Sequence, residues 1–369
     1  MFNQNKSRSN FIKLTTIFIS SIIFLPSLLF NTYYKLNRFK SYLNSDKLYN
    51  EIINETKNLT KEYRSFIVWR TKNHTHKHIN ISGRYNAGNS IGQDLNSSTW
   101  FFGGSSMWGY GVKDSDTIPS YFYNKTGLKV YNFAGLNWNS RQSLNQLINA
   151  LGDENKPSNI IFYDGKSNII NICKSNNNKI PQSINAFELI EEIRSSNKNF
   201  ISSNFNFWIK KIRITILEPH MKIISSFNNS FSGRKNNQDY IEFDCHLNHK
   251  KRKAIASHIV NDWYSAYLIA KANNVDFLAI LEPLSFYEYF SEDPNTIQPV
   301  SILENQDEVL YKSIREAVKE KCNKDPVFCV YFIDGSYWID NYSNDQTDSY
   351  NLLTNLNLYF ADKIFENFP

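Results

Sequence analysis

The segment Phe101 to Val112, FFGGSSMWGYGV, carries the residue types that a nucleophilic site needs. An apolar stretch runs directly into two glycines and two serines, and a helix is predicted to follow. At such a junction Ser105 exposes its hydroxyl and has its own N–H at a helix N-terminus, where the helix dipole stabilises an oxyanion. A glycine-rich turn with no catalytic role explains the same residues equally well. The Gly-x-Ser-x-Gly elbow of α/β-hydrolases does not fit, because Met107 stands where its second glycine is needed.

Together with three later segments, these residues resemble the SGNH or GDSL hydrolase family. The family opens with Gly-Asp-Ser-x-x-x-Gly, and Gly103, Gly104, Ser105 and Gly109 match this block with Gly in place of Asp. The resemblance covers Thr99 to Cys173 and about Ile255 to Ile364, in the order of the family's blocks. It implies that Ser105 is the nucleophile of an ester hydrolase or acyl transferase.

Two further blocks of the family supply its oxyanion hole. Asn-x-Gly-x-x-Gly resembles NFAGLNWNS, where Asn137 takes the position of the glycine whose backbone N–H binds the oxyanion. Gly-x-Asn-Asp resembles Gly165 to Asn168 (GKSN), where Ser167 takes the position of the Asn side chain. Each replacement keeps a hydrogen-bond donor, because Asn tolerates unusual backbone angles and a serine hydroxyl can donate.

The last block of the family is Asp-x-x-His followed by a helix, and here the general base is missing. Asp348 takes the place of the triad acid, but Asn351 stands where the family has histidine. No histidine follows His258 in the chain, so a local shift of the alignment cannot restore one. An amide is not basic enough to take a proton from Ser105. Loss of a triad member costs serine hydrolases about 10⁴- to 10⁶-fold in rate.

Other groups could replace this base or bind a metal, but nothing in the sequence places them at Ser105. The candidate bases are His258, Asp262 and the cluster His74, His76 and His78. That cluster alternates along HTHKH and could also hold a metal, or it is an exposed polar loop. Cys245 with His246 and His249 is likewise an incomplete ligand set. We therefore expect no metal and no cofactor.

Short apolar runs alternate with amphipathic helical stretches, which favours an α/β domain with a parallel sheet between two helical layers. The expected strands are Thr99 to Phe102, Val130 to Phe133, Asn159 to Tyr163, Val275 to Leu281 and Val327 to Ile333. The expected helices are Ser140 to Leu151, Ile255 to Asn273 and Val309 to Lys321. In such folds ligands gather at the carboxyl ends of the strands. We expect a single SGNH-hydrolase-like domain over residues 99–369.

Residues 1–98 differ from this domain in hydropathy pattern and charge. Leu14 to Phe30 is an uncharged, mostly apolar run that predicts a transmembrane anchor within residues 1–31, with a cleaved signal peptide as the competing interpretation. Residues 32–98 are expected to form a juxtamembrane stalk with a helix within Tyr49 to Val68. The first 100 residues contain 14 Lys and Arg against 5 Asp and Glu, whereas the whole chain carries +6. This distribution favours contact with an anionic bilayer over nucleic-acid binding.

A polar insertion at about residues 174–254 interrupts the domain, as a lid over the site or as a solvated excursion.

An N-terminal span predicts a single-pass membrane protein with an extracytoplasmic domain. Cys322 and Cys329 are close enough in sequence to form a disulfide across a short loop in an oxidising compartment, or they are free core thiols.

Two functions remain open: a hydrolase or O-acyl transferase acting through Ser105 on a carbohydrate or other ester, and a catalytically inactive module that binds glycans or a membrane partner.

Overall fold

The computed structural model describes residues 47–85, 95–152, 155–165, 172–173, 244–283, 300–342 and 349–368. All of them belong to one compact unit, Asp46–Ile190 with Tyr240–Pro369. The predicted anchor and most of the predicted insertion lie outside the described residues. Within the described part of the chain, no helix combines the length and the hydropathy that crossing a bilayer requires.

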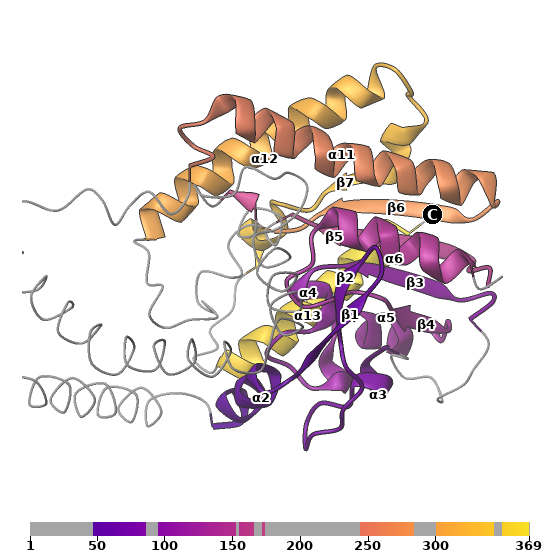
Figure 1. Ribbon diagram of the computed structural model, residues 1–369, viewed down its shortest axis with the longest axis vertical. Helices are drawn as coiled ribbons and strands as arrows, with labels where there is room; N and C mark the ends of the chain where they lie inside the picture. Colours follow the sequence, from indigo (N-terminus) through magenta and orange to yellow (C-terminus); the bar gives the residue numbers. More distant parts are fainter. Residues whose placement is uncertain are drawn as a thin grey trace, which may run out of the picture. The chain divides into compact units, whose positions relative to one another are not determined.

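Five parallel strands form the central sheet (Figure 1). Their spatial order is β4 (Val130–Asn132), β3 (Thr99–Gly103), β5 (Asn159–Asp164), β6 (Asp276–Leu281) and β7 (Phe332–Asp334). In chain order this is 2-1-3-4-5, a common order of doubly wound sheets. The predicted α/β class is confirmed, and each strand lies within or next to its predicted segment.

Helices cover both faces of the sheet because its strands are apolar on both sides. Trp100, Phe102 and Phe162 face one layer, made of α6 (Ser140–Gly152), α11 (His249–Ala272) and α12 (Val300–Cys322). Phe101, Ile161 and Tyr163 face the other layer. That layer consists of α2 (Lys47–Lys57), α3 (Ile81–Tyr85), α4 (Ser105–Trp108), α5 (Ile118–Thr126) and α13 (Ser349–Glu366). Short 3₁₀ turns span Asp114–Asp116, Phe328–Tyr331 and Trp338–Asn341.

Residues 47–85, which the sequence assigns to a stalk, contribute to the core of the domain. Helix α2 ends at Lys57, earlier than predicted, and buries Ile52 and Ile53 against the second layer. An antiparallel hairpin follows, formed by β1 (Lys61–Arg64) and β2 (Val68–Thr71). Two hydrogen bonds hold the hairpin to the loop after β4. The Trp69 indole donates to the carbonyl of Leu136, and the Trp138 indole donates to the carbonyl of Trp69.

The last predicted strand is shorter than expected. Only Phe332–Asp334 is extended, whereas Phe328–Tyr331 forms a 3₁₀ turn. The cause is local, because Pro326 begins the turn and a disulfide joins Cys322 to Cys329 across it. A second disulfide joins Cys173 to Cys245, so all four cysteines of the chain are bridged.

Candidate functional site

The polar residues of the predicted site gather at the carboxyl end of the sheet. Ser105 follows β3, Asn137 follows β4, and Asp164 ends β5. The chain reverses its winding between β3 and β5, so this is the switch point at which doubly wound folds bind ligands. Gly103 is required here because a Cβ at this position would come within 2.3 Å of the Tyr163 carbonyl oxygen. Close packing of β3 on β5 therefore explains the glycine that precedes the site.

Ser105 and Asn137 are in direct contact. The backbone N–H of Asn137 donates to the Ser105 Oγ at 2.9 Å, and the Ser105 hydroxyl lies 3.3 Å from the Asn137 Oδ1. Asn137 has a φ of 57°, the left-handed conformation that Asn tolerates better than most residues. This conformation directs its N–H toward the serine. The sequence expectation that these two residues meet at one site agrees with this geometry.

The loop that carries Asn137 is held by side chains on both sides. Asn132 donates its Nδ2 to the Met107 carbonyl at 3.0 Å and accepts from the Ala134 N–H at 3.1 Å. Thus one buried amide ties the end of β4 to α4. On the other side, the Trp69 and Trp138 indoles fix the loop to the hairpin.

The segment after Ser105 is fixed by a buried arginine. Helix α4 has only four residues and ends at Gly109, which has a φ of 95°. The fully buried Arg84 donates to the carbonyls of Gly109 and Val112 and pairs with Asp114 at 2.7 Å. Burial lowers the pKa of Arg84, while its ion pair with Asp114 opposes that effect. The macrodipole of so short a helix contributes little, so the Asn137 N–H is the group here that could donate to an oxyanion.

Three buried carboxyl groups, Asp164, Glu282 and Asp262, lie near one another, and the sequence analysis considered only Asp262 for the site, as a replacement base. Ser106 donates to Glu282 Oε2 at 2.7 Å, and the Trp263 indole donates to Asp164 at 3.1 Å. Burial raises the pKa of Asp164 to about 8 against the Trp263 hydrogen bond, and the nearby Glu282 and Asp262 act in the same direction as burial. Asp164 is therefore largely protonated at neutral pH. The sequence signal was an acid at the end of an apolar strand.

The remaining predicted site residues do not complete a triad within the described structure. Ser167 and Asp348 lie outside the described residues. Asn351 is exposed in the first turn of α13. Among described residues, Ser105 contacts only Asn137 through its hydroxyl, and its side chain is buried, with the residue 4% exposed.

Two of the candidate replacement bases, Asp262 and His78, have other partners. Asp262 accepts from Ser140 at 2.8 Å and pairs with Arg141 at 2.7 Å. The Nε2 atom of His78 lies 3.1 Å from Oε2 of Glu51. His258 is half-buried on α11 and forms no hydrogen bond with another described residue. None of them reaches the Ser105 hydroxyl.

The candidate metal ligands do not assemble either. Cys245 is bonded to Cys173, which removes it from a set with His246 and His249. The His74 and His76 rings touch edge to face at 4.3 Å between centroids. Across the described ranges, no group of three or more His, Cys, Asp or Glu side chains is arranged to hold a metal ion.

Comparison with known proteins adds no relative: no family model matches the chain, and no curated protein matches it. The SGNH resemblance is therefore carried by the residues quoted above.

Proposed function

We propose that the chain is an SGNH-hydrolase-like protein whose domain serves as a catalytically inactive binding or assembly module for glycans or a membrane partner. One observation carries the proposal: Ser105 is buried, and among the described residues its hydroxyl contacts the amide of Asn137 and no basic side chain. An amide accepts a hydrogen bond but does not take up the proton. The scaffold that positions Ser105 and Asn137 is compatible with this role, since a fold can be kept when its reaction is lost.

We place this module outside the cytoplasm, behind a membrane anchor over residues 14–30. The apolar run of that segment and the basic charge around it support the anchor. The two disulfides support an oxidising compartment, because structural disulfides are rare in reducing ones.

A second function is favoured by the 2.9 Å contact between the Asn137 N–H and Ser105 Oγ. In this alternative the protein is an ester hydrolase or O-acyl transferase acting on an acylated carbohydrate or other ester. Ser105 Oγ would attack the acyl carbon while a base oriented by Asp348 takes its proton, and the N–H groups of Ser105 and Asn137 with Ser167 would hold the oxyanion. The ester C–O bond would then break, the alcohol would leave with that proton, and water or an acceptor hydroxyl would take the acyl group from Ser105.

A fluorophosphonate probe separates the two functions, because it phosphonylates only an activated serine. We expect no labelling of the full-length protein in detergent micelles, in wild type or in Ser105→Ala. Ser106→Ala is the matched control, since Ser106 is the adjacent serine and is bonded to Glu282. Labelling that disappears in Ser105→Ala and persists in Ser106→Ala would contradict the inactive module and establish the second function.

A further inference from the structure

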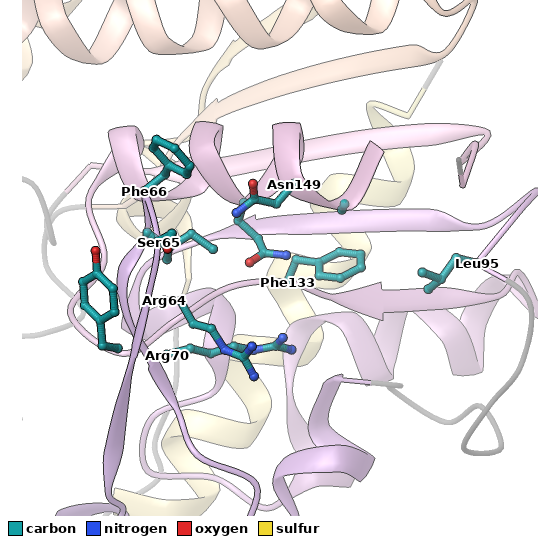
Figure 2. A pocket seen from close by; sticks show the side chains of 11 residues that line it. Arg64, Ser65, Phe66, Arg70, Leu95, Phe133 and Asn149 are labelled. Carbon is teal, nitrogen blue, oxygen red and sulfur yellow. The ribbon is translucent and has the colours of Figure 1, made fainter. Parts of the chain in front are cut away.

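A cavity of about 550 Å³ lies between the β1–β2 hairpin and α6 (Figure 2), and Ser105 is not among the residues that line it. The turn of the hairpin forms one wall, and Phe133, Gln146 and Asn149 form another. Amide side chains of α6 hold the hairpin in place: Gln142 donates to the Ile67 carbonyl and Asn145 donates to the Phe66 carbonyl. The volume is within the range of small-molecule sites.

Two arginines on one face of the hairpin line this cavity. Arg70 lies opposite Glu62 in the strand register, and Arg64 lies opposite Val68, so the two arginines are diagonal neighbours. Figure 2 shows both side chains extending in the same direction within the cavity. Arg64 pairs with Glu62 at 2.7 Å. Arg70 stacks 4.1 Å above the Tyr85 ring and has no carboxylate partner among the described residues.

Polar groups also line this region. Gln146 is a mostly buried residue of α6 whose side chain lines the cavity. A smaller pocket of about 220 Å³ shares Arg64 and Arg70 and is also lined by Tyr85. The Tyr85 hydroxyl is buried and has no partner in the described structure. Buried polar groups normally have hydrogen-bond partners, so the Tyr85 hydroxyl is suited to a ligand.

We infer that this cavity binds an acidic saccharide. A guanidinium without an acidic partner recognises a carboxylate with charge-assisted hydrogen bonds. The amides of Gln146 and Asn149 both donate and accept, as sugar hydroxyls do, and Phe133 offers an apolar surface to the face of a sugar ring. The site deepens the proposed binding function by naming the ligand class, and it lies apart from Ser105.

The test is calorimetric titration of the full-length protein in detergent with trigalacturonate, an acidic trisaccharide. A neutral galactose trisaccharide and triglutamate serve as comparison probes. We expect saturable binding of trigalacturonate. The neutral trisaccharide should bind at least about tenfold more weakly, because it lacks the carboxylate that forms a charge-assisted hydrogen bond. Triglutamate should also bind at least about tenfold more weakly, because it keeps the carboxylates but lacks the sugar hydroxyls and ring face. Absent binding, or equal binding of triglutamate, would overturn the inference.

Variants locate the bound sugar. Arg70→Met and Gln146→Glu should each weaken trigalacturonate at least about tenfold, because one removes a charge and the other places a carboxylate beside the ligand. Lys253→Met removes a charge from an exposed position on α11 and should leave binding within about twofold. Circular dichroism melts identify variants that fail to fold, and Arg70→Lys then replaces Arg70→Met.

Unchanged binding in both cavity variants would overturn the site. The assay requires no turnover, so its failure concerns the cavity alone. Fluorophosphonate labelling tests the absence of catalysis separately.

Discussion

At the scale of single residues, the site is defined by which groups Ser105 meets. Its position after an apolar strand and two glycines was predictable, as was its proximity to Asn137, whose positive φ is one that Asn accepts. The buried acids were not predictable as a group. Asp164, Asp262 and Glu282 come from β5, α11 and the end of β6, so only the fold brings them together.

Asp164 gives a pH-dependent prediction. Its pKa in the folded protein is raised from 3.8 to about 8, so the folded state binds a proton more tightly than the unfolded state between these values. Stability should therefore fall as pH rises through this window, by at most about 1.4 kcal/mol per pH unit. Asp164→Asn mimics the protonated acid, so this variant should lose less stability than the wild-type protein between pH 5 and pH 8.

Urea unfolding at pH 5, 7 and 8 measures this difference. Asp276→Asn, at the exposed start of β6, is the matched control. Parallel pH profiles for Asp164→Asn and wild type would show that Asp164 does not carry the effect.

At the scale of elements, the apolar runs were sufficient to predict the sheet, whereas the hairpin escaped prediction. Its turn, Ser65 to Ile67, contains no Gly, Asn or Asp, although Phe66 and Val68 both have positive φ. A β-branched residue in that conformation is unusual, so turn chemistry gave no signal. Tertiary contacts maintain this turn, through Gln142, Asn145 and the two indoles.

Arg84 links three elements around the segment that follows Ser105, because it joins α3 to Asp114 and to the Gly109 and Val112 carbonyls. Arg84→Met leaves those acceptors buried without their donor, and it should lower the free energy of unfolding by about 3–5 kcal/mol. Lys125→Met, which breaks the surface pair with Asp362, should cost less than about 1 kcal/mol. Urea unfolding of both variants tests the contrast, and similar losses would refute it.

At the scale of the whole molecule, the covalent links could not be derived from the sequence. Four cysteines allow three pairings, and Cys173 and Cys245 are 72 residues apart. That bridge joins the two ends of the predicted insertion, so it stabilises the domain mainly by restricting the unfolded chain.

Loop length predicts that the two disulfides contribute unequally to the free energy of unfolding. Chain entropy gives about 4 kcal/mol for the 72-residue loop and about 2 kcal/mol for the 7-residue loop between Cys322 and Cys329. Paired Cys→Ala variants of each bridge, compared by urea unfolding, measure the difference. A larger loss from the short loop would reverse this order.

The central claim is that Ser105 has no working base, and p-nitrophenyl acetate hydrolysis tests it most directly. Full-length wild type and Ser105→Ala are compared at equal concentration in the same detergent. We predict equal rates, because the Ser105 hydroxyl is bonded to Asn137 and no imidazole reaches it in the described structure. A wild-type rate that falls to background in Ser105→Ala would contradict the account and show that a base acts on this serine.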